Sequence, residues 1–114
     1  MAENNNPNIK SVQEIANQFS ESSSFLNAIS DGIRQDIILE ILKDGNKGTR
    51  VGELAKHCNL SRPAVSHHLQ ILRDAGVLSM RSEGTKNYYF VNTDRKEWKT
   101  ISKLCENIYN IRTV

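Results

Sequence analysis

The feature that most constrains the fold is a change in the spacing of apolar residues after Gly76. Before it, over residues 49–74, apolar side chains recur every three to four positions, as they do in amphipathic helices. After it, residues 77–82 and 86–91 are rich in strand-forming residues and are joined by a turn at Gly84. This switch predicts helices followed by a two-stranded antiparallel hairpin.

The helical part before the switch is typical of two short helices joined by a tight turn. We expect Thr49 to cap the first helix and Asn59 to adopt a positive φ in the turn. Ser61 is expected to cap the second helix, with Pro63 in its first turn, where a missing N–H costs nothing. The predicted buried stripe of the second helix comprises Val65, Leu69 and Leu72. Residues 49–74 thus form a predicted helix-turn-helix.

Three further amphipathic segments flank this motif. Residues 9–20 and 94–110 each carry one apolar stripe at helical spacing. A helix between them is predicted to start at the caps Ser30 and Asp31 and to end at Gly45. Its expected apolar stripe comprises Ile33, Ile37, Ile38, Ile41 and Leu42. The predicted fold is mainly α-helical, with about five helices and a two-stranded wing over 77–91: a winged helix-turn-helix.

Length and composition indicate one small domain that forms a dimer. The chain has 114 residues, of which 38% are hydrophobic, which is little for a stable monomer. Residues 1–8 are polar and asparagine-rich, so we expect a disordered lead-in before a single domain over 9–112. The stripes of 9–20 and 94–110 exceed what one core needs, although the closing helix could instead fold back on its own core. The predicted dimer interface comprises Val12, Ile15, Phe19, Trp98, Ile101, Leu104, Cys105 and Ile108.

The charge distribution favours a polyanionic partner. The net charge is only +2, but residues 45–90 carry seven lysines and arginines against three acidic residues. The sequence contains no apolar run long enough to span a bilayer and no apolar secretory signal at its start. With only two cysteines and no export signal, we expect a cytoplasmic protein.

The second helix of the motif presents a surface suited to double-stranded DNA. Opposite its buried stripe lie short or planar hydrogen-bonding groups that can contact base edges. Gln70 could pair with adenine, whereas Arg62 could pair with guanine or hold a phosphate. His67 is expected to face the DNA and His68 to be hydrogen-bonded within the domain. The predicted DNA-binding residues are Ser61, Arg62, Pro63, Ser66, His67 and Gln70, with Arg81 and Lys86 from the wing.

Three stretches resemble transcriptional regulators of the ArsR type. They are "AISDGIRQDIILEIL", "VGELAKHCNLSRPAVSHHLQILRDAGVLSMRSEGTKNYYFV" and the closing helix, and "SRPAVSHHLQILRDAGVL" is the most specific. The resemblance implies a homodimeric repressor on an inverted-repeat operator. It also implies that the helix matching 61–73 enters the major groove and that the hairpin matching 79–90 is the wing.

Many members of that family sense metals, but the familiar ligands are missing here. Arg50 stands where arsenic, lead and cadmium sensors carry a thiol, and arginine does not ligate metals. The closing helix has Asp94 but no histidine for a zinc-type site. His57 and Cys58 are consecutive on a helix, so they point about 100° apart and are poorly placed to join His67 and His68 around one ion. We expect no metal and no cofactor.

Two alternatives stay open beside a simple repressor. Cys58 and Cys105 could form a thiol-redox switch, with Cys58 the more exposed of the two and Cys105 a small hydrophobe in an apolar stripe. The other alternative is a winged-helix protein-interaction module without DNA binding, which would favour acidic or apolar residues on the outer face of 61–73. An enzyme is not expected, because no nucleophile–base set, phosphate loop or carboxylate pair is present.

Overall fold

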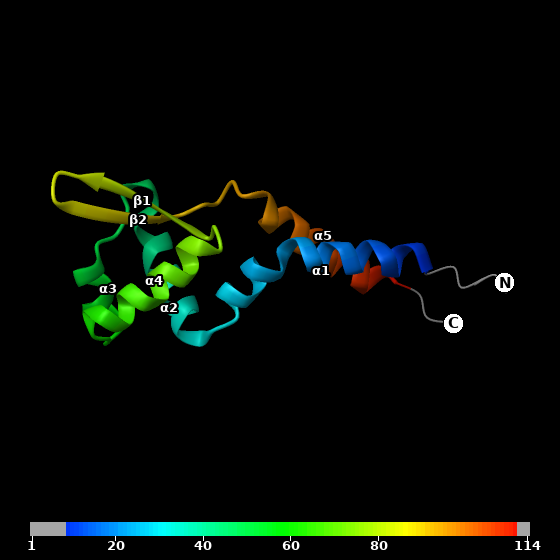
Figure 1. Ribbon diagram of the computed structural model, residues 1–114, viewed down its shortest axis with the longest axis horizontal. Helices are drawn as coiled ribbons and strands as arrows, with labels where there is room; N and C mark the ends of the chain where they lie inside the picture. Colours follow the sequence, from blue (N-terminus) through cyan, green and yellow to red (C-terminus); the bar gives the residue numbers. More distant parts are fainter. Residues whose placement is uncertain (1–8, 112–114) are drawn as a thin grey trace. The chain divides into compact units, whose positions relative to one another are not determined.

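The computed structural model describes residues 9–111, so the predicted lead-in over 1–8 and the end of the chain from 112 lie outside the described part. Its elements are the helices α1 (Ile9–Ile29), α2 (Gly32–Asp44), α3 (Val51–His57), α4 (Arg62–Asp74) and α5 (Lys96–Asn110), the 3₁₀ turn η1 (Gly45–Lys47), and the strands β1 (Leu78–Glu83) and β2 (Lys86–Val91) (Figure 1). This order confirms the predicted winged helix-turn-helix. The chain divides into two compact units, one comprising Ser24–Arg95 and the other combining the first part of α1 with α5.

The first helix is longer than the range predicted for it. It continues past residue 20 through a run of serines to Ile29. Serine usually competes with helical hydrogen bonds, but the Ser22 hydroxyl donates to the Gln18 carbonyl oxygen at 2.6 Å, within the helix itself. No glycine or proline interrupts the run, so the helix persists.

Helix α2 begins and ends where the sequence predicts, but its buried face is narrower. The Asp31 carboxylate accepts the Arg34 backbone N–H at 3.1 Å, and Gly45 has a φ of +57° beyond the last turn. Ile37, Ile38 and Ile41 are buried. Ile33 and Leu42 were predicted to share that face but are exposed, because they lie at its two edges.

The helix-turn-helix has the predicted turn and the predicted second cap. Asn59 has a φ of +54°, and the Ser61 hydroxyl accepts the Ala64 backbone N–H at 3.2 Å. The buried residues of α4 are Val65, Leu69 and Leu72, as predicted.

The prediction for Thr49 was wrong. Arg50 occupies the cap position of α3 and makes no side-chain cap bond. Thr49 instead forms an antiparallel bridge with Tyr89, with both N–H to carbonyl distances at 2.8 Å, and its hydroxyl donates to Asp44 Oδ2 at 2.6 Å. The first bonded N–H groups of α3, those of Glu53 and Leu54, donate to the Arg50 carbonyl oxygen, so the cap position falls one residue after Thr49. Thr49 therefore fastens the base of the hairpin to the helices.

The hairpin is regular and ends in a tight turn. Its register runs from Leu78 opposite Val91 to Glu83 opposite Lys86, and Gly84 in the connection has a φ of +65°. Val77 and Leu78 are buried at its base, where it joins the core of this unit.

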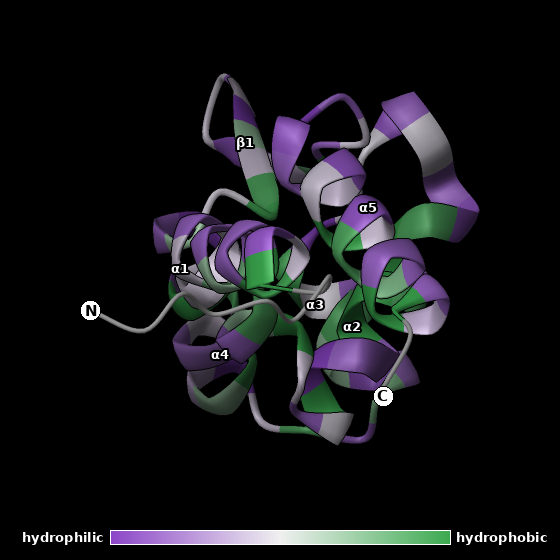
Figure 2. Ribbon diagram, turned by 90° about the vertical axis from the view of Figure 1, so that its right-hand side faces the viewer, coloured by the Kyte–Doolittle hydropathy of each residue, from purple (hydrophilic) through white to green (hydrophobic). Residues whose placement is uncertain are grey.

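The second unit consists of α5 and the first part of α1, and both helices carry hydrophobic and hydrophilic segments (Figure 2). Ile15 and Leu104 are its buried hydrophobic residues, and Asn107 Nδ2 donates to Gln18 Oε1 at 3.1 Å. Several larger apolar residues of this unit are left exposed. Within residues 9–111, no helix combines the length and hydrophobicity needed to cross a membrane.

Candidate nucleic-acid interface

The outer face of α4 carries the polar groups predicted to contact DNA bases. Ser66, His67 and Gln70 are exposed, on the side of the helix opposite its fully buried stripe. Gln70 Nε2 donates to Asp74 Oδ1, one helical turn further on, at 2.8 Å. At the start of α4, Ser61 and Pro63 are exposed, although the Ser61 hydroxyl is already used for capping. This convex face can enter a groove, but it encloses no substrate.

The two adjacent histidines have different surroundings. The His67 ring is exposed and lies edge-on to His68, with ring centroids 5.5 Å apart. His68 is half-buried, and its Nδ1 lies 3.3 Å from Arg34 Nη1. Because a guanidinium can only donate, Nδ1 accepts this bond and the ring proton is on Nε2. His68 is thus bonded within the domain, as predicted, and His67 is free to face a partner.

Arg34 connects this histidine to the end of the first helix. Its Nε donates to the Ala28 carbonyl oxygen at 2.7 Å, and its Nη2 donates to the Asn27 carbonyl oxygen at 3.3 Å. These are among the last carbonyls of α1, which have no partner within the helix.

The two predicted basic residues of the wing differ in whether their side chains are free to bind a phosphate. Arg81 donates to Glu83 Oε2 at 2.6 Å and to the carbonyl oxygens of Asn46 and Lys47 at 3.2 and 2.8 Å. Its guanidinium also lies 5.2 Å from the centre of the Tyr88 ring. Lys86 is exposed, and its side chain has no bonding partner among residues 9–111. Arg81 therefore holds the wing in place, whereas Lys86 is available to a phosphate.

Arg62 lies in a cavity that the sequence did not reveal. The cavity, of about 330 Å³, also contains Arg50 from the start of α3 and Thr85 and Asn87 from the wing. A basic residue just before the first helix of a helix-turn-helix was the available signal for Arg50.

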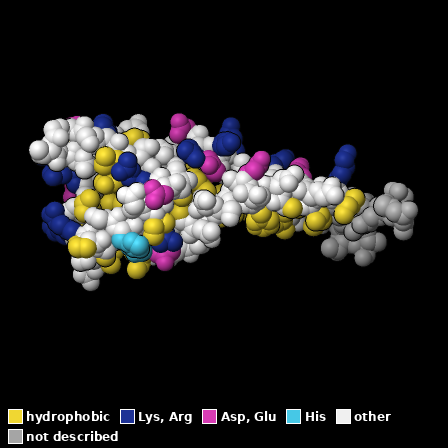
Figure 3. Space-filling view, viewed as in Figure 1, with side chains coloured by type: hydrophobic (Ala, Val, Ile, Leu, Met, Phe, Trp, Pro, Cys, Tyr) yellow, Lys and Arg dark blue, Asp and Glu magenta, His cyan; other side chains and the backbone are white. Residues whose placement is uncertain are grey.

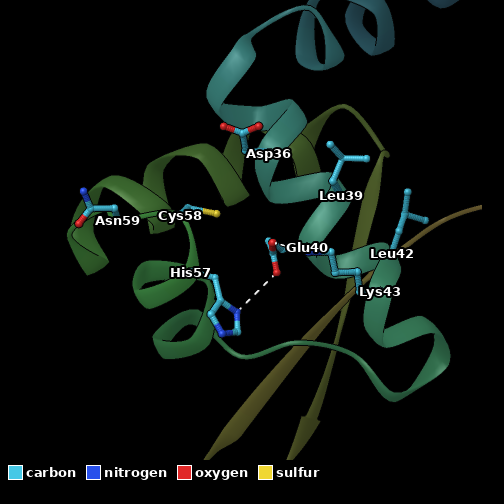
Figure 4. Close-up of a pocket in the computed structure, with 8 residues that line it drawn as sticks. All are labelled: Asp36, Leu39, Glu40, Leu42, Lys43, His57, Cys58 and Asn59. Atoms are coloured by element: carbon cyan, nitrogen blue, oxygen red, sulfur yellow. Dashed lines mark hydrogen bonds and ion pairs between the residues drawn. The ribbon is translucent and has the colours of Figure 1, made fainter.

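A second, larger cavity lies between α2 and the end of α3 (Figure 4). Its volume is about 650 Å³, and its lining includes Glu40, which contacts Lys43 Nζ at 2.9 Å and His57 Nδ1 at 3.5 Å. The Cys58 thiol is half-buried here, and burial, followed by the nearby carboxylates of Glu40 and Asp36, raises its pKa. Among residues 9–111, no three His, Cys, Asp or Glu side chains are grouped to hold a metal ion.

The two cysteines reverse the expected order of exposure. Cys58 is half-buried, whereas Cys105 is exposed on α5. A raised pKa lowers the thiolate fraction of Cys58 at neutral pH.

The residues predicted for a dimer interface fall into two groups. Ile15 and Leu104 are buried within the single chain, whereas Val12, Phe19 and Ile108 are 47%, 48% and 45% exposed. Trp98 and Ile101 are half-buried, and the exposed Tyr109 was not predicted. Hydrophobic side chains form a continuous stripe along one side of this unit (Figure 3).

Comparisons with known proteins agree with this geometry. The family described as "Bacterial regulatory protein, arsR family" matches residues 36–79. The transcriptional repressor SdpR of Bacillus subtilis is 42% identical over 71 residues, covering 62% of this chain and 76% of that protein. An uncharacterized HTH-type transcriptional regulator of Methanocaldococcus jannaschii is 32% identical over 91 residues, covering 80% of this chain and 98% of the relative.

A solved structure supports the same fold. The ArsR-like transcriptional regulator from Rhodococcus sp. RHA1 superposes with a TM-score of 0.70 at 24% identity, covering 82% of each chain. The winged helix-turn-helix, its exposed polar helix face and these relatives lead to one conclusion: the chain belongs to the ArsR family of DNA-binding transcriptional regulators, and it is not an enzyme.

Proposed function

We propose that this regulator is a repressor that binds an inverted-repeat operator as a homodimer. Residues 9–112 would act as a single domain, with the helix-turn-helix over 49–74 and the wing over 77–91. The relatives named as transcriptional repressors support the direction of regulation.

The observation that carries the proposal is the outer face of α4. Ser66, His67 and Gln70 are exposed on this face. The side chains on the opposite face of the helix are only 0–1% exposed. Such hydrogen-bonding groups fit base edges in the major groove, with Gln70 suited to adenine. A face built for a protein partner would instead be acidic or apolar. The other proposed DNA-binding residues are Ser61, Arg62, Pro63 and Lys86. Arg81 would position the wing against the DNA.

The exposed stripe on α1 and α5 supports the homodimer. Val12, Phe19, Ile108 and Tyr109 expose large apolar surfaces on the two helices of one unit. Burying them against a second copy would pair the two stripes by a two-fold axis. Two copies of α4 would then meet the DNA about 34 Å apart, one helical turn.

The proposed repressor uses neither arsenic-type nor zinc-type sensing ligands. Arg50 occupies the thiol position of the first type, and α5 contains no histidine for the second. The chain is similar to repressors named for arsenical or mercury resistance. The proposed repressor does not respond to arsenic or mercury.

Selection of bound duplexes from a random DNA pool tests the proposal. We expect the selected sequences to form an imperfect inverted repeat with half-site centres about 10 base pairs apart. Binding to that duplex, followed by fluorescence anisotropy, should fall steeply with salt and should not respond to a panel of metals or to a chelator.

His67→Ala and His57→Ala form a matched pair for the same measurement. Both histidines are exposed, but only His67 lies on the outer face of α4. His67→Ala should weaken binding to the selected duplex by about 1–3 kcal/mol, whereas His57→Ala should leave it unchanged. Selection of no common sequence by the wild-type protein would favour the protein-interaction module, and release by oxidant alone would favour the thiol switch.

A further inference from the structure

The strongest unassigned feature is the cavity where the helix-turn-helix meets the wing. Three segments distant in the sequence converge on it: the start of α3, the start of α4 and the turn between β1 and β2. Figure 3 shows Lys and Arg side chains gathered over the part of this unit where α3 and the tip of the hairpin lie. The lining residues are Arg50, Val51, Gly52, Glu53, Arg62, Thr85 and Asn87.

The two arginines of the cavity have unused donors. Both are exposed, and neither side chain forms a hydrogen bond or an ion pair with any residue in the described part of the chain. Arg34 and Arg81, in contrast, each donate to backbone carbonyls within the same unit. Two guanidinium groups in one cavity repel each other unless an anion lies between them.

Gly52 explains why Arg62 can lie in this cavity. A Cβ atom on Gly52 would be 2.8 Å from Arg62 Nη2 and 3.4 Å from its Cζ. The absence of a side chain on Gly52 thus lets the guanidinium of Arg62 rest on the first turn of α3. Arg50 and the wing residues Thr85 and Asn87 line the same cavity. The residues of α4 that are suited to base edges (Ser66, His67 and Gln70) do not line the cavity.

The charge and chemistry of the cavity match a DNA backbone phosphate. Two arginines and one carboxylate, Glu53, give the lining a net charge of one positive unit. A phosphodiester carries one negative charge, and arginine binds it with two parallel donors. The Thr85 hydroxyl and the Asn87 amide add uncharged donors from the wing.

We propose that Arg50 and Arg62 bind one phosphate of the DNA backbone at the junction of α3, α4 and the wing, and that Gly52 positions Arg62 for this task. The proposal rests on the proposed function, since it requires DNA at this face. It resolves the two roles that the sequence left open for Arg62 in favour of phosphate over guanine. It also adds Arg50, Gly52, Thr85 and Asn87 to the interface.

The test uses a duplex of mixed sequence, about 30 base pairs long, because phosphate contacts do not depend on sequence. Affinity is measured by fluorescence anisotropy between about 50 and about 200 mM salt for the wild-type protein and for Arg50→Ala, Arg62→Ala and Gly52→Ala. Lys56→Ala removes one positive charge from α3 outside the cavity and serves as the control.

Each arginine variant should bind the duplex about tenfold more weakly at equal salt. Because the two arginines share one phosphate, removing both should reduce the steepness of the plot of log affinity against log salt by about 0.9 per bound protomer, and removing either one should reduce it by less. Gly52→Ala should weaken binding in the same direction, although its melting temperature should not fall, because alanine favours a helix more than glycine. Adding Gly52→Ala to Arg62→Ala should cause no further loss, since the only role assigned to Gly52 is to position Arg62.

Several results would overturn the site. Arg62→Ala could lose affinity only for the selected operator and keep the salt dependence of the wild-type protein, which would make Arg62 a base reader. The arginine variants could match Lys56→Ala, which would reduce the effect to net charge. Equal binding by the wild-type protein and all variants overturns this site alone, whereas a wild-type protein that binds no duplex overturns the proposed function together with it.

Discussion

The two units of this chain differ in how completely they bury their apolar residues. In the unit from Ser24 to Arg95, the end of α1, the helices α2, α3 and α4 and the base of the hairpin contribute to a core of eleven buried hydrophobic residues, including Leu54 and Leu72 at 0% exposure. In the unit formed by α1 and α5, Ile15 and Leu104 are buried, while Phe19 and Ile108 remain about half exposed. Both units nevertheless contain helices with an apolar face.

This difference separates two uses of the same helical pattern. The closed core stabilises the unit from Ser24 to Arg95 by itself. The exposed apolar residues of α1 and α5 contribute fully to stability only when a second surface covers them. The DNA-binding unit does carry exposed apolar residues on α2, with Leu39 at 58%. Leu39 and Leu42 lie beside polar groups at the second cavity, and both belong to the single helix α2.

The largest loss of stability is expected from Leu72→Ala, in the closed core of the unit from Ser24 to Arg95. Removing this fully buried side chain leaves a cavity, so the free energy of unfolding should fall by about 2–5 kcal/mol. Urea denaturation at two protein concentrations measures it. The loss should be the same at both concentrations, because this core lies within one chain; a loss that grows on dilution would contradict the comparison.

A somewhat smaller effect is expected from Phe19→Glu, in the open stripe. The variant places a charge on the proposed interface, so the dimer dissociation constant should rise by about 10- to 100-fold, the equivalent of one buried aromatic side chain. Sedimentation equilibrium measures the change. Leu39→Glu is the matched control, since Leu39 is even more exposed than Phe19 but lies on α2; equal effects of the two variants would place the interface elsewhere.

His68→Ala should lower the free energy of unfolding by about 1 kcal/mol, because it removes the hydrogen-bond acceptor of the Arg34 guanidinium. His67→Ala should change the free energy of unfolding by less than about 0.5 kcal/mol, because its ring is exposed. Urea denaturation compares them. Equal losses from the two variants would contradict the division of roles between the two histidines.

The smallest effect concerns Asp31, the half-buried cap of α2. The Arg34 backbone N–H, followed by the positive charge of that arginine, holds the pKa of the Asp31 carboxyl below its ordinary value of 3.8. A lowered pKa stabilises the fold above pH 3.8, and this contribution is lost as the pH falls through the folded pKa. Asp31→Asn should therefore lower the melting temperature slightly at neutral pH and reduce its fall on acidification. Parallel melting curves down to acidic pH would refute the linkage.

Features encoded by neighbouring residues were predictable from the sequence. The stripe of α4, the caps Asp31 and Ser61 and the positive φ of Asn59 all depend on side chains within one or two turns. The contrast between His67 and His68 followed from the same periodicity, because it depends only on their angle to the buried stripe.

Features that join distant segments were not predictable in this way. Thr49 looked like a cap because its own neighbourhood suits one, and its actual partner, Tyr89, lies on a strand much later in the chain. Arg81 appeared free to bind DNA because nothing local indicates that the carbonyls of Asn46 and Lys47 reach it. Likewise, Gly52 acquires its meaning only when the fold brings Arg62 against it.

The anchoring of the hairpin has a mechanical consequence for regulation. The Thr49 bridge to Tyr89 and the Arg81 bonds to the preceding loop fasten the base and the side of the wing to the helices. The wing is therefore fastened at two places to the segment between α2 and α3. In the proposed homodimer, a signal that releases DNA would then move one DNA-binding unit relative to the other, rather than move the wing relative to its own helices.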